Sequence, residues 1–289
     1  MGRQSRKRKT RAESTPPPKA SPRWQYLLPR GRRWLWLAGL VIVAVIILIV
    51  RLSGPQPHSG AEIRAALIDQ LSPAFPNDEF RSAVAADIDL MNLSLDVYEG
   101  DEVDVELYRS LGEHPYGLMV IRSHSGILEL EGAENLRITS LFTNEPYSQY
   151  RYVTEQLVDR ILIVRPFEED PDLTFGVAPD FFRHSMRGEL PNTIVVVAGC
   201  SILGQTDLAE ALLSQGASAI ISWDQSVGLN HADEGTARFI HHLLTDHMTV
   251  EDAVDAAMEE IGPDPEFGAV LKYYPDSAGQ LTAEQLLGR

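Results

Sequence analysis

The sequence predicts an α/β fold, namely a three-layer, Rossmann-like domain with a mostly parallel six-stranded sheet, preceded by one transmembrane helix. Three observations support this prediction. Strand-like apolar runs alternate with amphipathic helix-like segments between residues 64 and 274, as is typical of a parallel sheet. Two of these runs end in His124 and Cys200, and residues 34–50 carry no charge.

The uncharged run at residues 34–50 is long enough to cross a bilayer as a helix. No small-residue cleavage pattern follows it, so we expect an uncleaved transmembrane helix over 34–52 that contacts the lipid bilayer. Several Arg residues precede the run and only Arg51 directly follows it, and such a bias places the amino-terminal side in the cytoplasm. The sequence therefore predicts a single-pass protein of the cell membrane with an extracytoplasmic carboxyl-terminal domain.

Charge divides the chain at the same place. The first 51 positions hold 12 of the 25 Lys and Arg residues and one of the 41 Asp and Glu residues, which leaves 13 basic and 40 acidic residues beyond them. We interpret residues 1–33 as a disordered basic cytoplasmic tail and residues 53–60 as a linker. The tail directly precedes a membrane span and lacks interleaved aromatic residues, so we predict no binding to nucleic acid.

The domain predicted over residues 61–289 begins with a strand at 64–69, and its later elements follow in alternation. The expected strands lie at 93–98, 116–123, 193–199, 218–224 and 270–274, and the expected helices at 77–91, 103–111, 206–215, 234–245 and 250–261. Residues 127–192 are less regular, and we interpret them as an insertion. Within it we expect a strand at 137–143 and helices at 150–161 and 180–186.

Cys200 is the only cysteine of the chain, and a lone cysteine is usually a small core residue. Its place after an apolar strand suggests another role. His124 follows a second apolar strand, and a thiol and an imidazole at the carboxyl ends of two sheet strands could form a nucleophile and its base. A structural role for His124, in which the imidazole caps the strand end, is the alternative.

The segments Val120-Ile-Arg-Ser-His124-Ser-Gly126 and Val196-Val-Ala-Gly-Cys200-Ser201 resemble the two motifs of the caspase-like (clan CD) cysteine peptidases. This group includes metacaspases, gingipains, separases and CHAT-domain proteins. Residues 208–223 also resemble the helix and strand that follow the nucleophile in CHAT-domain proteins. The resemblance implies a caspase-like fold over roughly residues 62–275, with His124 on the third core strand and Cys200 on the fourth.

By this resemblance the chain would be a cysteine endopeptidase that acts on a peptide or protein substrate. The backbone N–H groups of Cys200, Ser125 and Gly126 would stabilise the oxyanion. Family members usually have Gly directly after His, whereas Ser125 intervenes here.

Asp69 and Asp224 end the first and fifth expected core strands, near the edge where caspase-like enzymes recognise the substrate residue before the scissile bond. Two carboxylates there would favour Arg or Lys. The alternative is that both acids cap loops or are solvated.

No metal site or other cofactor is expected, because His231, His241 and His242 lack the spacing of zinc ligands. A Rossmann-like domain of another kind is disfavoured because no Gly-x-Gly-x-x-Gly follows the first strand. A catalytically silent caspase-like binding or signalling module tethered to the membrane remains the main alternative. The sequence leaves the oligomeric state open.

Overall fold

The computed structural model describes residues 62–129, 137–166 and 172–288, all of which belong to one compact unit, Pro55–Arg289. The predicted tail, transmembrane span and linker lie outside the described residues. Within the described part of the chain, no helix combines the length and apolar character needed to cross a membrane.

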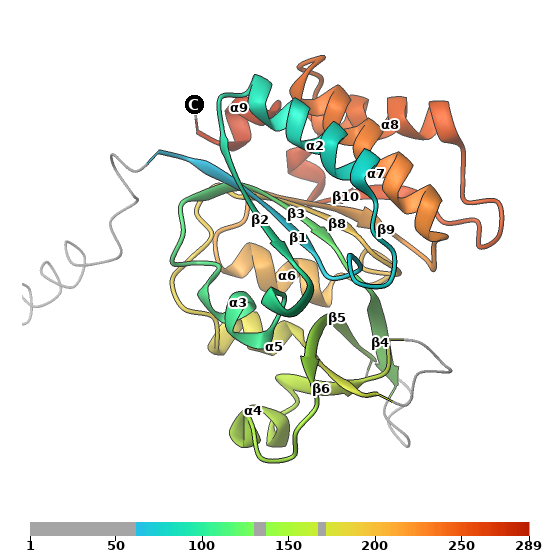
Figure 1. Ribbon diagram of the computed structural model, residues 1–289. Helices are drawn as coiled ribbons and strands as arrows, with labels where there is room; N and C mark the ends of the chain where they lie inside the picture. The colour runs from blue at the N-terminus through green and yellow to red at the C-terminus, as the bar shows by residue number, and fades with distance from the viewer. Residues whose placement is uncertain (1–61, 130–136, 167–171, 289) are drawn as a thin grey trace, which may run out of the picture. The chain divides into compact units, whose positions relative to one another are not determined.

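A mixed six-stranded sheet forms the centre of this unit, in the order β10-β9-β8-β3-β1-β2 (Figure 1). Its strands are β1 (Arg64–Asp69), β2 (Ser94–Glu99), β3 (Tyr116–Arg122), β8 (Ile194–Ala198), β9 (Ala219–Trp223) and β10 (Leu271–Tyr274). All neighbouring pairs are parallel except β9 and β10, which are antiparallel. The prediction of a mostly parallel six-stranded sheet is confirmed, and each predicted core strand matches an observed one within two residues.

Burial explains why these apolar runs form strands. Every residue of β1 after Arg64, and every residue of β3, β8 and β9, is buried, whereas none of the residues of the edge strand β2 is. Parallel strands that are covered on both faces need continuous apolar runs rather than alternation, and the run at 116–122 has that character. The two charged residues within these buried strand segments are Asp69 and Arg122, which form an ion pair with each other.

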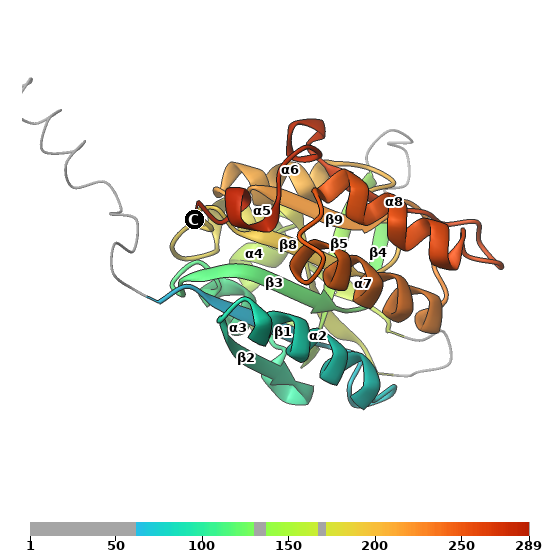
Figure 2. The ribbon, with the colours of Figure 1, turned by 90° about the horizontal axis from the view of Figure 1, so that it is seen from above.

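Helices cover both faces of the sheet (Figure 1). Alternate strand residues, such as Val120 and Ile121, contribute to separate apolar cores on the two faces. One core includes side chains from α2 (Asp78–Leu90), α7 (Leu229–Leu244), α8 (Val250–Ile261) and α9 (Ala283–Leu286), and the other includes side chains from α3 (Val105–Ser110), α5 (Pro179–His184) and α6 (Asp207–Ser214). Figure 2 shows α2, α7 and α8 lying across the first of these faces.

The helix ends follow from local capping. The Asn77 side chain accepts a hydrogen bond from the Phe80 N–H at 3.0 Å and starts α2 at the predicted place. Thr249 caps α8 in the same way through the Asp252 N–H. Helix α7 instead begins at Leu229, five residues before the predicted start, and its N-cap residue Gly228 is held by a hydrogen bond from its N–H to the Asp264 carboxylate at 2.9 Å.

The insertion between the His124 and Cys200 strands forms a second, antiparallel sheet in the order β4-β5-β7-β6. Its strands are β4 (Ser125–Glu129), β5 (Arg137–Pro146), β6 (Ile161–Val164) and β7 (Thr174–Val177). The predicted strand at 137–143 and the predicted helix at 180–186 are confirmed as β5 and α5. The predicted helix at 150–161 is wrong for most of its length, because α4 covers only Val153–Leu157. The apolar residues that follow α4 pair with β7 as strand β6.

A buried ion-pair triad lies where strands β1 and β3 end. The Arg122 guanidinium donates two hydrogen bonds to Asp233, at 2.8 and 2.9 Å, and one to Asp69 at 2.9 Å. All three side chains are almost inaccessible to solvent. Arg122 also donates to the Phe75 carbonyl, and the Asn77 side chain donates to Asp233. The triad therefore connects β1, β3, α7 and the start of α2.

Removal of the shared cation should destabilise the fold strongly. We expect Arg122→Met to lower the free energy of unfolding by about 3–5 kcal/mol, because two buried carboxylates lose their partner. The matched control is Arg238→Met, which removes a half-exposed arginine paired with Glu260, and it should cost less than about 1 kcal/mol. Urea unfolding followed by circular dichroism measures both values. Equal losses in the two variants would contradict the importance given to the triad.

Candidate functional site

His124 lies directly beyond the end of β3, in the short connection to β4. Its backbone N–H donates to the Gln70 side-chain oxygen at 2.9 Å, and its carbonyl accepts from the Phe142 N–H at 3.0 Å. The imidazole is half-buried and its ring centroid lies 6.1 Å from that of Phe142. Both sides of the backbone at His124 are thus fixed, one by the end of β1 and one by the insertion.

Cys200 lies two residues beyond β8, at the start of a turn. The half-buried thiol donates a weak hydrogen bond to the Val227 carbonyl, with a sulfur–oxygen distance of 3.7 Å. The preceding Gly199 permits a close approach of the chain, since a Cβ there would lie 2.8 Å from the Ser123 carbonyl oxygen. The residue after the thiol, Ser201, adopts a left-handed conformation and its N–H donates to the Gln225 carbonyl.

Parallel pairing of β3 with β8 brings these two residues to the same edge of the sheet. Arg122 pairs with Ala198, so His124 and Cys200 occupy matching positions two residues further on. The Ser123 N–H donates to the Ala198 carbonyl at 3.2 Å, which continues the ladder past the strand ends. The expected placement on adjacent third and fourth core strands therefore agrees with the observed strand order.

The predicted oxyanion residues Ser125 and Gly126 begin strand β4. The Ser125 hydroxyl donates to the Cys200 carbonyl at 2.6 Å, so it ties the His124 connection to the Cys200 turn. Gly126 pairs with Ser140 of β5, and a Cβ at Gly126 would lie 3.3 Å from the Phe142 ring. Ser125 thus makes a direct contact with the Cys200 turn.

Burial lowers the pKa of His124 from its ordinary value of 6.5, and the positive charge of Arg122 lowers it further. The imidazole is consequently neutral at physiological pH, which is the form that can accept a proton. A general base must be neutral to accept a proton, so the lowered pKa of His124 is compatible with a role as a base.

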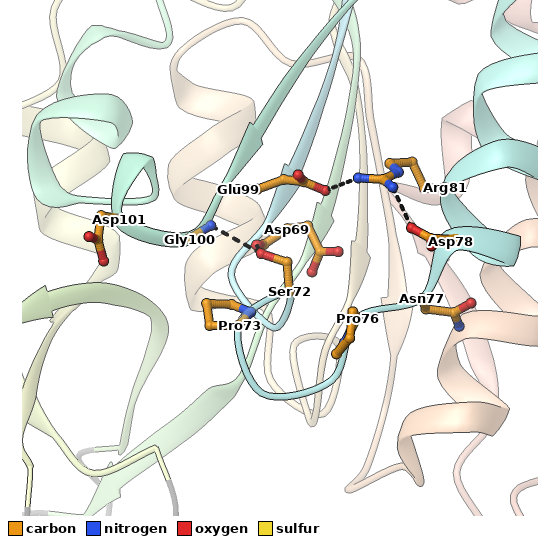
Figure 3. A pocket seen from close by; sticks show the side chains of 10 residues that line it. All are labelled: Asp69, Ser72, Pro73, Pro76, Asn77, Asp78, Arg81, Glu99, Gly100 and Asp101. Atoms are coloured by element: carbon orange, nitrogen blue, oxygen red, sulfur yellow. Dashed lines mark hydrogen bonds and ion pairs between the residues drawn. The ribbon is translucent and has the colours of Figure 1, made fainter.

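Asp69 is buried at the end of β1, where its carboxylate pairs with Arg122 and accepts the Leu71 N–H at 3.1 Å. Burial raises its pKa although Arg122 opposes the shift. Asp69 also lines a cavity of about 450 Å³ beside the ends of β1 and β2 (Figure 3).

The cavity beside Asp69 is acidic. Its other charged lining residues are Asp78, Arg81, Glu99 and Asp101, and Arg81 forms ion pairs with Asp78 and Glu99 (Figure 3). Four carboxylates and one guanidinium give the lining an excess of negative charge, which favours a cationic occupant.

Asp224, the second predicted pocket residue, directly follows β9, and strands β8 and β3 lie between β9 and β1. One carboxylate oxygen accepts the Val270 N–H at 3.0 Å and the other lies 2.8 Å from the Lys272 ammonium. Asp224 is not among the residues that line the cavity beside Asp69. Its observed contacts join β9 to β10, as expected for a carboxylate that caps a strand end.

Three residues with central contacts were missed by the sequence reasoning. The sequence could have identified Arg122, because a charged residue at the end of an otherwise apolar strand needs a buried partner. No local pattern in the sequence identifies Gln70 or Asp233, since their contacts to His124 and Arg122 join segments far apart in the chain.

The histidines considered as metal ligands are bound to other groups. His231 contacts the Gly262 carbonyl, His241 contacts Asp87, and His242 lies between Asp246 and Glu260. Among the residues that the structure describes, no group of three or more His, Cys, Asp or Glu side chains is arranged to hold a metal ion.

Comparison with known proteins does not assign the chain to a family. Neither a scan against protein-family models nor a search of curated proteins gives a significant match.

The depressed pKa of His124 should make stability depend on pH. Below the ordinary histidine pKa of 6.5 the unfolded chain binds a proton that the folded protein resists, so the folded state loses stability as pH falls. We therefore expect the difference in unfolding free energy between the wild type and His124→Gln to shift against the wild type between about pH 8 and about pH 5.5. Denaturant unfolding at several pH values measures this difference. If the difference in unfolding free energy is constant with pH, or shifts in favour of the wild type as pH falls, the pKa of His124 is not lowered in the folded protein.

Proposed function

We propose that the chain is a membrane-anchored, caspase-like cysteine endopeptidase in which Cys200 is the nucleophile and His124 its base. The observation that carries this proposal is the parallel pairing of β3 with β8, which brings both residues to matching positions beyond two adjacent strand ends. A nucleophile and a base at the ends of neighbouring strands share one rigid scaffold, which keeps the two groups in a fixed arrangement relative to each other.

The strand order adds support. The resemblance to caspase-like domains implies that the Cys-bearing fourth core strand lies beside the His-bearing third. The order β2-β1-β3-β8-β9-β10 has this arrangement, with helices on both faces. Other doubly wound α/β folds share this order, so the choice of a caspase-like domain rests on the two sequence motifs that end in His124 and Cys200.

The proposed reaction is acyl transfer through a thioester. Neutral His124 takes the thiol proton, and the thiolate of Cys200 attacks the carbonyl carbon of the scissile peptide bond. The carbon–nitrogen bond then breaks as the imidazolium returns the proton to the leaving amine. Water, deprotonated by His124, hydrolyses the thioester and restores the thiol. Backbone N–H groups of Cys200, Ser125 or Gly126 would bind the oxyanion.

A basic residue before the scissile bond fits the acidic cavity beside Asp69. The cavity begins at the end of β1, and β1 is the direct neighbour of β3. The adjacent Gln70 binds the backbone of His124, so the cavity and the proposed dyad share one connecting segment. Asp224 has a weaker claim to the same role because it does not line this cavity.

We include the membrane anchor and the extracytoplasmic location in the proposal on the basis of the sequence alone. They rest on the uncharged run at 34–50 and on the concentration of basic residues before it.

One observation favours the second candidate, a catalytically silent binding or signalling module. The Cys200 thiol donates to the Val227 carbonyl and packs against the apolar core beneath α7 and α8. A thiol used in this way is a structural residue, and a module of this kind would still offer the acidic cavity to a basic ligand.

Peptide hydrolysis separates the two candidates. We expect the full-length chain in detergent to cleave fluorogenic peptides with Arg or Lys before the reporter amide, and to cleave matched Gln peptides at least about tenfold more slowly, because the acidic cavity favours a cation. Cys200→Ala should abolish hydrolysis, because the thioester cannot form. Initial rates measured by fluorescence give the comparison.

Cys200→Ser is the conservative control, since it keeps the side-chain volume and removes the thiol. Equal hydrolysis by the wild type and Cys200→Ala would eliminate Cys200 as the nucleophile. Binding of an Arg peptide without hydrolysis by the wild type would favour the silent module. The role of Asp69 is read from the Arg to Gln rate ratio in Asp69→Asn, which should fall towards one if that carboxylate contacts the substrate.

A further inference from the structure

A cluster of exposed apolar side chains lies on the insertion, apart from the proposed dyad. Five of the ten large apolar residues that are exposed in the described part of the chain fall between residues 150 and 163. They are Tyr150, Val153, Leu157, Val158 and Ile163, and Tyr150 and Leu157 are 82% and 80% exposed. Single exposed apolar residues are normal, but such a concentration marks an interaction surface.

The same segment contains an open strand edge. Strand β6 is the last strand of the insertion sheet, and its other neighbour position is unfilled in the described part of the chain. The Ala178 N–H donates to the Arg160 carbonyl, so in the antiparallel register Leu162 and Val164 bond to β7. The backbone N–H and carbonyl groups of Ile161 and Ile163 therefore face the open side. An apolar open edge is a template for another strand.

Buried polar contacts hold this surface in place. The buried carboxylate of Glu145 accepts hydrogen bonds from the Tyr152 hydroxyl and from the Val105 N–H at the start of α3, each at 3.1 Å. Arg109 of α3 forms an ion pair with Glu155 of α4 at 3.1 Å. Helix α4 is therefore anchored to α3 while its apolar residues remain exposed, so the surface is presented on a fixed base.

Charge at the open edge indicates the partner. Of the Arg and Lys residues that the structure describes, Arg160 is the one whose guanidinium has no ion pair, hydrogen bond or ring contact. The chain beyond residue 51 has 40 acidic and 13 basic residues, so a cation without a carboxylate partner is unexpected here. Arg160 directly precedes β6 and is placed to pair with an acid at the end of an added strand.

We propose that β6 and α4 form a docking site for an extended segment of a partner protein, in which apolar residues are flanked by an acidic residue that pairs with Arg160. Such a segment would add a strand to the β6 edge and cover the apolar side chains of α4.

Two other occupants fit less well. A pair of β6 strands from two copies would join strands of only four residues each, and the acidic bodies would repel each other. A lipid surface would leave the polar groups of the open edge without hydrogen bonds.

Fluorescence anisotropy of labelled peptides with the full-length chain in detergent tests this proposal. The probes are the peptide Asp-Val-Thr-Val-Thr-Val-Asp and the matched peptide with Lys at both ends. We expect the acidic peptide to bind about fivefold more tightly than the basic one, and Arg160→Glu to reverse the order. Ile163→Pro should abolish binding of both peptides, because it removes an N–H from the open edge.

Leu90→Ser is the matched control, since it removes an apolar side chain of α2 that is 62% exposed, and it should leave binding unchanged. Absence of binding to the wild type, or an unchanged preference in Arg160→Glu, would overturn the proposal. Self-association of the wild type that Arg160→Glu abolishes would assign the surface to a second copy and also overturn it. Because the readout is binding, it is independent of whether Cys200 acts as a nucleophile.

Discussion

The buried pairing of Arg122 with Asp69 and Asp233 is the constraint on which the geometry of the candidate site depends. A guanidinium at the end of β3 is tolerated in the core only because two carboxylates neutralise it. Asp69 comes from β1 and Asp233 from α7, so one side chain fixes two strand ends and a helix. His124 lies two residues beyond Arg122, and its position follows from that of the triad.

A second set of polar contacts extends this constraint into the insertion. Gln70, which follows Asp69, accepts the His124 N–H and donates to the Asn144 side chain at 2.8 Å. Asn144 belongs to β5, and its amide donates back to the Gln70 carbonyl. On the other side of His124, Ser125 binds the Cys200 carbonyl. The insertion therefore does more than fill a connection, because its first strands fix the segment that carries the imidazole.

The central fold could be predicted from the sequence because its information is local. Continuous apolar runs such as 116–121 predict buried strands, and the capping residue Asn77 predicts the start of α2. The insertion sheet could not be predicted in full, since its short strand at 161–164 continues the apolar pattern of the preceding helix. Asp69 was identified at a strand end, but its pairing with Arg122 spans 53 residues and that of Asp233 spans 111, and no local pattern encodes such contacts.

The reactivity of Cys200 towards iodoacetamide tests the central claim, that the paired strand ends join a thiol to a neutral imidazole. Cys200 is the only cysteine, so mass spectrometry of the intact chain reports this one site. At about pH 6.5 we expect His124→Gln to be alkylated at least about tenfold more slowly than the wild type, because the imidazole no longer accepts the thiol proton. His241→Gln, which changes an imidazole bound to Asp87, should have no effect. Equal rates in the wild type and His124→Gln would show that His124 does not act as the base for Cys200.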